Sequence, residues 1–287
     1  MNRADRFKAN SITHSALVID GRSIDQRSVA SCGIAFMAKA SAPGRAKTRL
    51  VPPLTFDEAA DLNTAFLQDV AENLELASHR TPQPVVIAGY AAYGPPGSED
   101  FFRAILPDSI GMLAAWLPNF GDCLFHTICE LLQRGHKSAV VLNADSPTLP
   151  TAFLVETAEA LARPGDRAVL GPSTDGGYYL LGLKAAHRRM FEDIDWSTER
   201  VAEQTLERAR EIDLEIHTLP AWYDVDDLDD LRRLHGEVCG SDNDRRRRDG
   251  VAPHRAGQTA AWMRKLARGR DFLRSSTRIL QAEEARA

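Results

Sequence analysis

The sequence contains little cysteine and no long apolar segment. Its 287 residues include four cysteines, and no two of them form a C-x-x-C pair. Four separated thiols do not make a disulfide framework, which favours a reducing compartment. The sequence contains no run of 18 apolar residues that could span a bilayer. It also contains no short apolar core near the N-terminus of the kind that indicates a secretory signal. We therefore expect a cytoplasmic protein.

The composition is otherwise ordinary, with 44% hydrophobic and 26% charged residues. These values exclude a collagen, a disordered chain and a membrane protein. The net charge of −5 is unevenly distributed, because residues 241–287 hold twelve basic and six acidic residues. The acidic remainder does not indicate a nucleic-acid binder. The basic tail either packs on the acidic body, which we favour, or makes a weak contact with an anionic surface.

Apolar runs alternate with amphipathic stretches between about residues 31 and 238, which predicts an α/β domain. Residues 1–30 lack periodicity and are expected to form a flexible N-terminal extension. Residues 239–287 form a basic tail that we expect to be partly helical, with an exposed basic helix over Ala260–Leu280. The predicted strands are Gly33–Ala38, Val85–Gly89, Ala139–Leu142, Arg167–Leu170 and Tyr178–Leu183. The predicted fold is a three-layer α/β/α open sheet with mostly parallel strands.

Helix signals lie between these strands. Thr55 and Glu58 form a capping box, and the following helix places Ala59, Leu62, Phe66, Val70 and Leu74 on one face. Ser197 is predicted to cap another helix, with Trp196 and Val201 as a hydrophobic staple. Three further helices are predicted over Leu124–Leu132, Ala152–Leu161 and Leu228–Leu234.

Ligands of open α/β sheets bind beyond the carboxyl ends of the strands, so the residues there matter most. The first strand is followed by four cations, Lys39, Arg45, Lys47 and Arg49. Cations at this place suit the phosphates of a nucleotide, although a solvated basic loop is the alternative. The spacing matches neither a Walker A loop nor a G-x-G-x-x-G dinucleotide loop.

Carboxylates follow the later strands. Asp145 comes directly after an apolar strand, where a Mg²⁺ ion could meet a bound phosphate, or where the side chain could instead cap a turn. Asp175 is followed by two glycines, either as a hairpin turn or as a place where a ligand approaches the backbone. Asp224 and Asp226 face the same side if their segment is extended and could share a cation, although part of this acidic run is helix N-terminal charge.

Four segments together resemble a bacterial family of GT-A-type glycosyltransferase-like proteins. They are Met37–Leu50, Asn143–Pro150, Gly171–Tyr179 and the pair Trp196-Ser-Thr198 with Tyr223-Asp-Val-Asp226. Some members of that family are named arsenosugar-biosynthesis glycosyltransferases. The same segments are more distantly similar to 2-phospholactate guanylyltransferases. The resemblance covers about residues 33–234 and implies the nucleotide-diphospho-sugar transferase fold.

The resemblance also implies roles for individual residues. Lys39, Arg45, Lys47 and Arg49, together with Asp122, would bind the donor nucleotide. Asp145 would bind Mg²⁺ or Mn²⁺, with Asn143 in the position of a first acid, and Asp226 could supply a second ligand. Gly176, Gly177, Tyr178, Trp196, Ser197 and Thr198 would line the substrate side, and Asp175 and Asp224 are the candidate catalytic bases.

One segment departs from the family pattern. Where the family has Gly-Asp-Leu-Gly-x-Arg-Met, this chain has Leu124 in place of the second glycine and His126 in place of the arginine. The leading expectation is a metal-dependent transfer of a sugar from a nucleotide-diphospho-sugar to a small acceptor. The alternative is a nucleotidyltransferase that uses an NTP and a phosphorylated small molecule. The third possibility is a non-catalytic nucleotide-binding scaffold.

Overall fold

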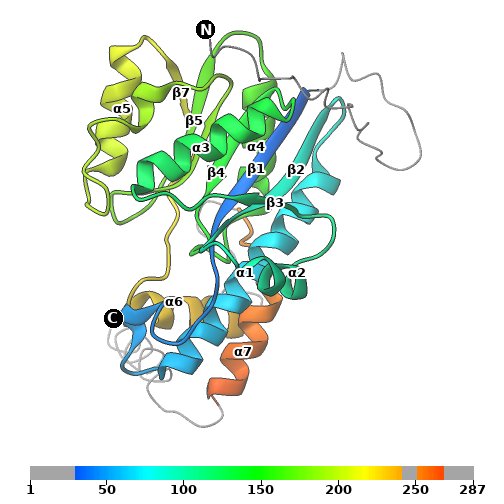
Figure 1. Cartoon of the computed structure of the whole chain (residues 1–287). Coiled ribbons are helices and arrows are strands. Elements are labelled where there is room, and N and C mark those ends of the chain that lie inside the picture. The colour runs from blue at the N-terminus through cyan, green and yellow to red at the C-terminus, as the bar shows by residue number, and fades with distance from the viewer. Residues whose placement is uncertain (1–29, 241–250, 268–287) are drawn as a thin grey trace, which may run out of the picture.

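Seven strands form one open sheet with helices on both faces (Figure 1). The computed structural model describes residues 30–240 and 251–267. The strands are β1 (Ala30–Lys39), β2 (Val85–Gly94), β3 (Gly111–Ala114), β4 (Ser138–Leu142), β5 (Arg167–Pro172), β6 (Tyr178–Leu183) and β7 (Glu215–Thr218). Their order across the sheet is β3-β2-β1-β4-β6-β5-β7. This arrangement confirms the predicted three-layer α/β/α class.

Most neighbouring strands are parallel, and β6 is the exception. It pairs antiparallel with β4 on one side and with β5 on the other. The β5–β6 connection is therefore a hairpin, and it contains the Asp175-Gly-Gly turn. All five predicted strands are present, whereas β3 and β7 were missed. Both are four-residue strands at the sheet edges with few buried side chains, so they lack the continuous apolar run by which buried strands are recognised.

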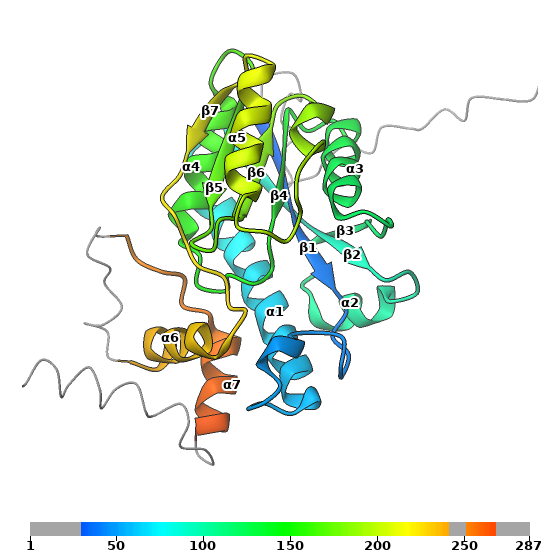
Figure 2. The same cartoon turned by 90° about the vertical axis from the view of Figure 1, so that its left-hand side faces the viewer.

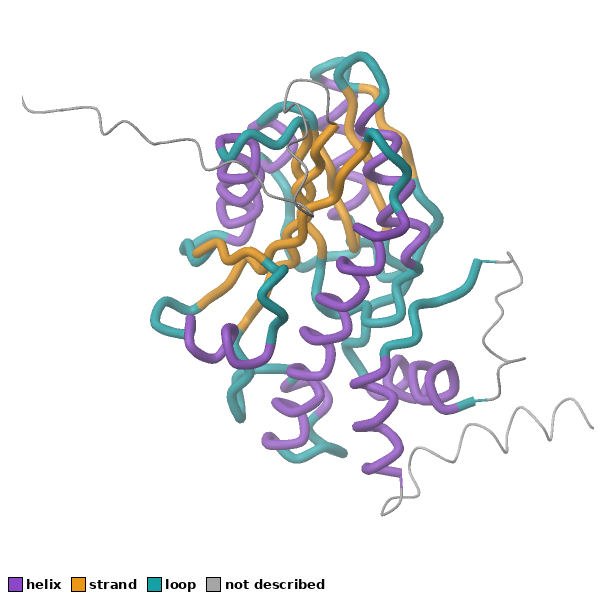
Figure 3. The backbone as a smooth tube through the Cα atoms, turned by 90° about the vertical axis from the view of Figure 1, so that its right-hand side faces the viewer, coloured by secondary structure: helices purple, strands orange, loops and turns teal. Residues whose placement is uncertain are grey.

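Helices cover the two faces of the sheet (Figure 3). The helices are α1 (Phe56–Arg80), α2 (Glu99–Ile105), α3 (Phe120–Gln133), α4 (Thr151–Ala162), α5 (Val201–Glu211), α6 (Leu228–Cys239) and α7 (Gly257–Ala267), with 3-10 turns η1 (Thr48–Leu50) and η2 (Arg188–Phe191). Side chains of α1 and α4 enter one buried apolar cluster, and those of α3 and α5 enter the other. No helix in residues 30–240 and 251–267 has the length and apolarity needed to cross a membrane.

Local signals explain where most helices begin. The Thr55–Glu58 capping box is present, and the five apolar positions predicted for the helix that follows it are all buried. Asp227 and Asp230 form a second capping box at the start of α6. The predicted Ser197 cap is wrong, because Ser197 has a φ of 65° and α5 begins only at Val201. The hydroxyl of Thr198 instead donates to the Asp195 carbonyl and accepts from the Arg200 N–H, which builds a turn ahead of the helix.

A helical group lies below the carboxyl ends of the central strands (Figures 1 and 2). It consists of the start of α1, α6 and α7, with Ala256, Ala260 and Met263 buried in the core that α1 and α6 share. The carboxylate of Asp69 in α1 accepts the backbone N–H groups of Gln258 and Thr259, which fixes the start of α7. The predicted helix is present over residues 260–267, but its predicted exposure is wrong for the face that carries Ala260 and Met263. The rest of the predicted range, with residues 1–29 and 241–250, lies outside the described residues.

Candidate active site

Two adjoining cavities open at the carboxyl end of the sheet. The larger has a volume of about 550 Å³ and the smaller about 330 Å³. Both are lined by Met37, Arg49, Ala144, Asp145 and Asp226, so these residues form their common boundary. The two cavities differ in charge, because they receive different loops from the sheet.

The smaller cavity is predominantly basic. Its wall contains all four cations that follow β1, namely Lys39, Arg45, Lys47 and Arg49, against two carboxylates, Asp145 and Asp226. The loop that carries these cations is fixed by the 3-10 turn η1, whose Leu50 is fully buried. The structure thus brings together the four residues that the sequence predicted for phosphate binding.

Lys47 connects this loop to two distant segments. Its backbone is left-handed, with a φ of 49°, and its side chain is only 6% exposed. The Lys47 ammonium lies 2.7 Å from Asp145 Oδ1 and 3.7 Å from Asp226 Oδ1, and it donates to the Val225 carbonyl at 2.6 Å. The ring of Phe66 lies 5.2 Å below it. This buried ammonium, surrounded by acceptors, fixes the boundary between the cavities.

The loop after β4 is held from behind, which fixes Asp145. The Asn73 amide of α1 donates to the Leu149 carbonyl at 2.7 Å. His254 of the C-terminal segment donates its backbone N–H to the Thr148 carbonyl, and its ring Nδ1 lies 3.0 Å from the Pro147 carbonyl. The Thr148 hydroxyl donates to Glu237 Oε2 of α6 at 2.9 Å. The segment beyond residue 250 therefore supports the loop that carries a candidate site residue.

Residues 222–226 run as an extended segment beside this loop. The Val225 N–H donates to the Asp145 carbonyl at 3.0 Å, and Trp222 forms an isolated bridge with Ser173. Tyr223 and Val225 are buried, whereas Asp224 and Asp226 alternate with them and line the larger cavity. The two carboxylates share one side of the segment, as the spacing predicted.

Crowding of carboxylates raises two pKa values. Burial, followed by repulsion from Asp175 and Asp226, raises the pKa of Asp224 to about 7. Burial also raises the pKa of Asp226, although the Lys47 ammonium acts in the opposite direction. Arg49 lies 3.2 Å from Asp226 but its side chain is 74% exposed, so it offsets little of this charge. The two boundary carboxylates, Asp145 and Asp226, are therefore matched in number by the buried Lys47 and the exposed Arg49.

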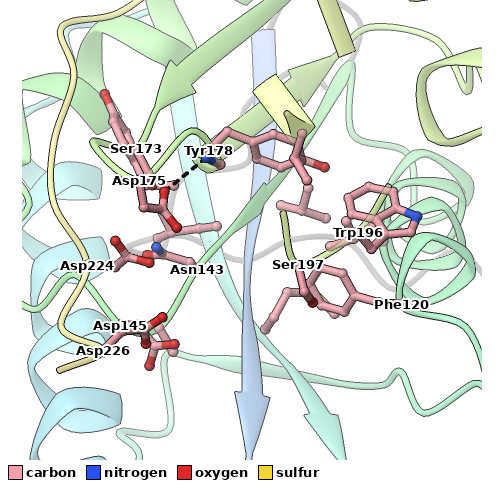
Figure 4. A pocket seen from close by; sticks show the side chains of 18 of the residues that line it. Phe120, Asn143, Asp145, Ser173, Asp175, Tyr178, Trp196, Ser197, Asp224 and Asp226 are labelled. Carbon is pink, nitrogen blue, oxygen red and sulfur yellow. Dashed lines mark hydrogen bonds between the residues drawn. The ribbon is translucent and has the colours of Figure 1, made fainter. Parts of the chain in front are cut away.

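The Asp175 turn forms the upper wall of the larger cavity (Figure 4). The Gly177 N–H donates to Asp175 Oδ1 at 2.9 Å, which orients the carboxylate. Gly176 has a φ of 91°, and a Cβ there would lie 2.0 Å from the Glu199 carbonyl oxygen. The glycine thus permits close packing of the hairpin on the 194–200 loop. Gly177 lines the cavity, but Gly176 does not belong to its lining and packs behind it.

Aromatic side chains form the opposite end of the larger cavity (Figure 4). Trp196 packs edge-to-face on Phe120, with ring centroids 5.5 Å apart, and on Tyr178, at 6.4 Å. Gly121 makes room for this indole, because a Cβ at Gly121 would lie 2.7 Å from Trp196 Nε1. Ser197 and Thr198 continue the same wall. Of the residues predicted for the substrate side, Gly177, Tyr178, Trp196, Ser197 and Thr198 therefore line one cavity, whereas Gly176 does not.

Some residues differ from the sequence-based predictions. Asp122 lines neither of the two cavities and is paired with Arg188 at 2.9 Å, so the structure does not bring it to the other nucleotide-binding candidates. Phe120, Glu199 and the Val225 carbonyl were missed. Phe120 is 52% exposed at the start of α3, where a sequence pattern gives no reason to single it out. A backbone carbonyl carries no residue-type signal at all.

The boundary can hold a cation through two carboxylates. Asp145 and Asp226 converge on one ammonium, so their spacing suits a shared positive ion. Within the described residues, no cluster of three or more acidic, His or Cys side chains could hold a metal without other ligands. Mg²⁺ often takes one or two carboxylates and completes its shell with phosphate oxygens and water. The residues present therefore fit a metal that binds together with a phosphate.

Comparison with known proteins identifies the fold. A protein of Desulfovibrio desulfuricans G20, provisionally described as a nucleotide-diphospho-sugar transferase, is 26% identical, with a TM-score of 0.69 over 86% of this chain and 98% of that chain. This likeness supports a transferase. None of the curated proteins matches the sequence.

Two enzyme structures have lower similarity. A CMP-2-keto-3-deoxy-manno-octonic acid synthetase complexed with CTP is 13% identical, with a TM-score of 0.45 over 71% of this chain and 96% of that chain. A cytidylyltransferase of Leptospira borgpetersenii is 10% identical, with a TM-score of 0.46 over 84% of this chain and 96% of that chain. Likenesses of this size say nothing about substrate or residue roles.

One family model also matches, over residues 77–198, and its description is "Uncharacterized protein conserved in bacteria (DUF2064)". The matched segment runs from the end of α1 to Thr198 and includes Asp145, Asp175 and Trp196. The basic loop and Asp226 lie outside it. The predicted resemblance is confirmed: residues 77–198 match the DUF2064 family model, and the chain has the nucleotide-diphospho-sugar transferase fold.

Proposed function

We propose that this protein transfers a sugar from a nucleotide-diphospho-sugar to a small acceptor. The observation that carries the proposal is the separation of charge between two adjoining cavities. The basic cavity suits the diphosphate of the donor, because Lys and Arg form charge-assisted hydrogen bonds with phosphate oxygens. The larger, acidic and aromatic cavity suits the sugar and the acceptor. The two substrates would meet at Asp145 and Asp226.

The residues have distinct tasks in this proposal. Lys39, Arg45, Lys47 and Arg49 bind the two phosphates and stabilise the charge that develops on the leaving diphosphate. Asp145 and Asp226 would hold a divalent metal, Mg²⁺ or Mn²⁺, which supplies further charge neutralisation at the diphosphate when it is bound. Lys47 already contacts both carboxylates. It therefore lies where metal-binding side chains and phosphates would adjoin.

A carboxylate in the larger cavity would accept the proton of the acceptor hydroxyl. Asp224 and Asp175 both line that cavity. Asp175 is oriented by the Gly177 N–H, whereas Asp224 lies between Asp175 and the boundary residues (Figure 4). We favour Asp224 as the base because its segment, held by the buried Trp222, Tyr223 and Val225, is the more rigidly placed.

Nucleotidyl transfer to a phosphorylated acceptor is the competing activity. It would use the same cations and the same Asp145. It would also require the acceptor phosphate to lie in the larger cavity, where Arg49 is the only cation among the described lining residues. Charge therefore favours sugar transfer over nucleotidyl transfer.

Thermal unfolding in the presence of ligands tests the proposal. The full chain is heated with nucleotide-diphospho-sugars, nucleoside diphosphates and NTPs, each with and without Mg²⁺ or Mn²⁺. A ligand at about 100 times its Kd adds about 2.7 kcal/mol of stability, which is a shift of several degrees in Tm. We expect a metal-dependent shift with one nucleotide-sugar that disappears in Asp145→Ala. A larger shift with an NTP would favour nucleotidyl transfer, and the absence of any shift with every nucleotide would overturn both transfer activities.

A further inference from the structure

We propose that the larger cavity binds an uncharged, hydroxyl-bearing ring compound as the acceptor and excludes phosphorylated ones. This inference rests on the proposed function and names its acceptor class. It follows from three features of the cavity: its charge, its aromatic end and the arrangement of one relative to the other.

The charge of the cavity disfavours an anionic acceptor. Five carboxylates line it, Asp145, Asp175, Glu199, Asp224 and Asp226. Arg49 is its one cation within the described residues, and that guanidinium already contacts Asp226 at 3.2 Å. Asp145 and Asp226 also contact the Lys47 ammonium, so a phosphate in this cavity would chiefly face Asp175, Glu199 and Asp224, without a free counter-ion. The phosphates of the donor have a basic cavity next to it, so they do not need this one.

The aromatic end provides an apolar surface for a ring. Phe120 is 52% exposed, and Trp196 packs edge-to-face on both Phe120 and Tyr178. This corner is built into the fold, because the indole occupies the space that Gly121 leaves open. Exposed aromatic side chains bind apolar ring faces with little loss of conformational freedom. The corner therefore suits the flat or apolar face of a ligand.

The two surfaces oppose each other across one cavity (Figure 4). Carboxylates accept hydrogen bonds from hydroxyl groups, and the aromatic corner contacts carbon–hydrogen or ring surfaces. A compound with an apolar ring face and a hydroxyl edge satisfies both at once. The volume of about 550 Å³ has room for such a ring beside the donor sugar.

The reaction that follows is balanced without a further reagent. The bond between the anomeric carbon and the diphosphate oxygen breaks, and the bond between that carbon and the acceptor oxygen forms. The acceptor hydroxyl proton passes to a cavity carboxylate, and the nucleoside diphosphate leaves with the bonding electron pair. Because the acceptor loses only a hydroxyl proton, it needs no phosphate of its own.

Direct binding to the full chain, without nucleotide, tests the acceptor class. Phenyl β-glucoside is compared with its 6-phosphate by saturation-transfer NMR and titration. We expect the uncharged compound to bind at least about tenfold more tightly, as unfavourable charge–charge contacts of this kind predict. Equal or tighter binding of the 6-phosphate that Trp196→Ala also weakens would overturn the inference, because it would place the phosphorylated compound in the larger cavity and not in the basic one. So would the absence of binding by the uncharged compound, or tighter binding of benzylamine.

A pair of tryptophan variants locates the binding. Trp196→Ala should weaken phenyl β-glucoside binding about tenfold, and Trp196→Phe should retain most of it, because an aromatic face remains. Trp116→Ala is the matched control, since Trp116 is 50% exposed and lines neither cavity. Equal losses in Trp196→Ala and Trp116→Ala would refute the assignment. A missing nucleotide shift would refute sugar transfer instead, so the two failures are distinguishable.

Discussion

The two cavities share five residues but are built from different kinds of loop. The smaller is lined by the cations that follow β1. The larger is lined by the carboxylates that follow β4 and β5 and by those within the extended 222–226 segment. Positive charge thereby lies on one side of Asp145 and Asp226, and negative charge lies on the other. A single large cavity with mixed charges could not hold phosphates at one end and exclude them from the other. Under the proposed function, this division of charge would orient the two substrates.

The largest expected effect tests the basic side of this comparison. Lys47→Met should weaken nucleoside diphosphate binding about 100-fold, because it removes a charge-assisted contact worth up to about 3 kcal/mol. Isothermal titration with the full chain and Mg²⁺ measures this. Asp175→Asn is the control from the acidic cavity, and its affinity for the same diphosphate should stay within about threefold of the wild type. Equal losses in the two variants would end the distinction between the cavities.

The wall of the acidic cavity depends on one glycine. Gly176→Ala forces a left-handed backbone on alanine and places its Cβ 2.0 Å from the Glu199 carbonyl oxygen. We expect a loss of about 2–3 kcal/mol, seen as a fall of about 5 °C in Tm. Gly177→Ala is the matched variant, because the atom nearest to its Cβ would be Asp175 Oδ1, at 3.2 Å. If Gly177→Ala proves the more harmful, the hairpin does not pack as described.

His136 is a buried histidine that lines neither cavity. Its effect on the pH dependence of stability has to be separated from that of the cavity carboxylates. His136 is 5% exposed, and it contacts Ser31 and the Tyr90 hydroxyl. Burial, with a smaller effect of Arg134, lowers the pKa of His136 to about 4. The unfolded chain then binds more protons between about pH 6.5 and 4, so the stability present above pH 6.5 is lost as the pH falls.

Urea unfolding at two pH values measures this contribution. Between pH 7 and pH 5 the wild type should lose about 2 kcal/mol through His136. His136→Gln should lose less over the same interval, and the difference between the two chains isolates the histidine from the cavity carboxylates. An identical pH dependence in both chains would show that the imidazole is not responsible.

The smallest expected effect concerns the contact between α1 and the start of α7. Asp69→Ala removes the carboxylate that accepts the first N–H groups of α7. Loss of such a cap costs about 1 kcal/mol, or about 2 °C in Tm. Asp61→Ala, an exposed aspartate of the same helix α1, should leave Tm within about 1 °C, as is usual for surface changes. A Tm of Asp69→Ala that is no lower than that of Asp61→Ala would mean that α7 does not depend on Asp69.

Much of the fold followed from the sequence because its signals are local. Buried strands such as β4 and β6 are short apolar runs, and the Thr55 capping box fixes the start of α1 through two hydrogen bonds within four residues. The alternation of Asp224 and Asp226 with buried Tyr223 and Val225 is likewise a property of an extended chain. Such patterns need no knowledge of distant segments.

The division into two cavities was decided only by the tertiary structure. Lys47, Asp145 and Val225 are far apart in the chain, and only the strand order brings their loops to one edge of the sheet. The same holds for the pairing of Asp122 with Arg188, and for the hydrogen bonds of His254 behind the Asp145 loop. The sequence by itself determined which side chains could bind a phosphate or a metal. Which of them meet depended on long-range packing, because residue type and spacing do not encode the distance between separate loops.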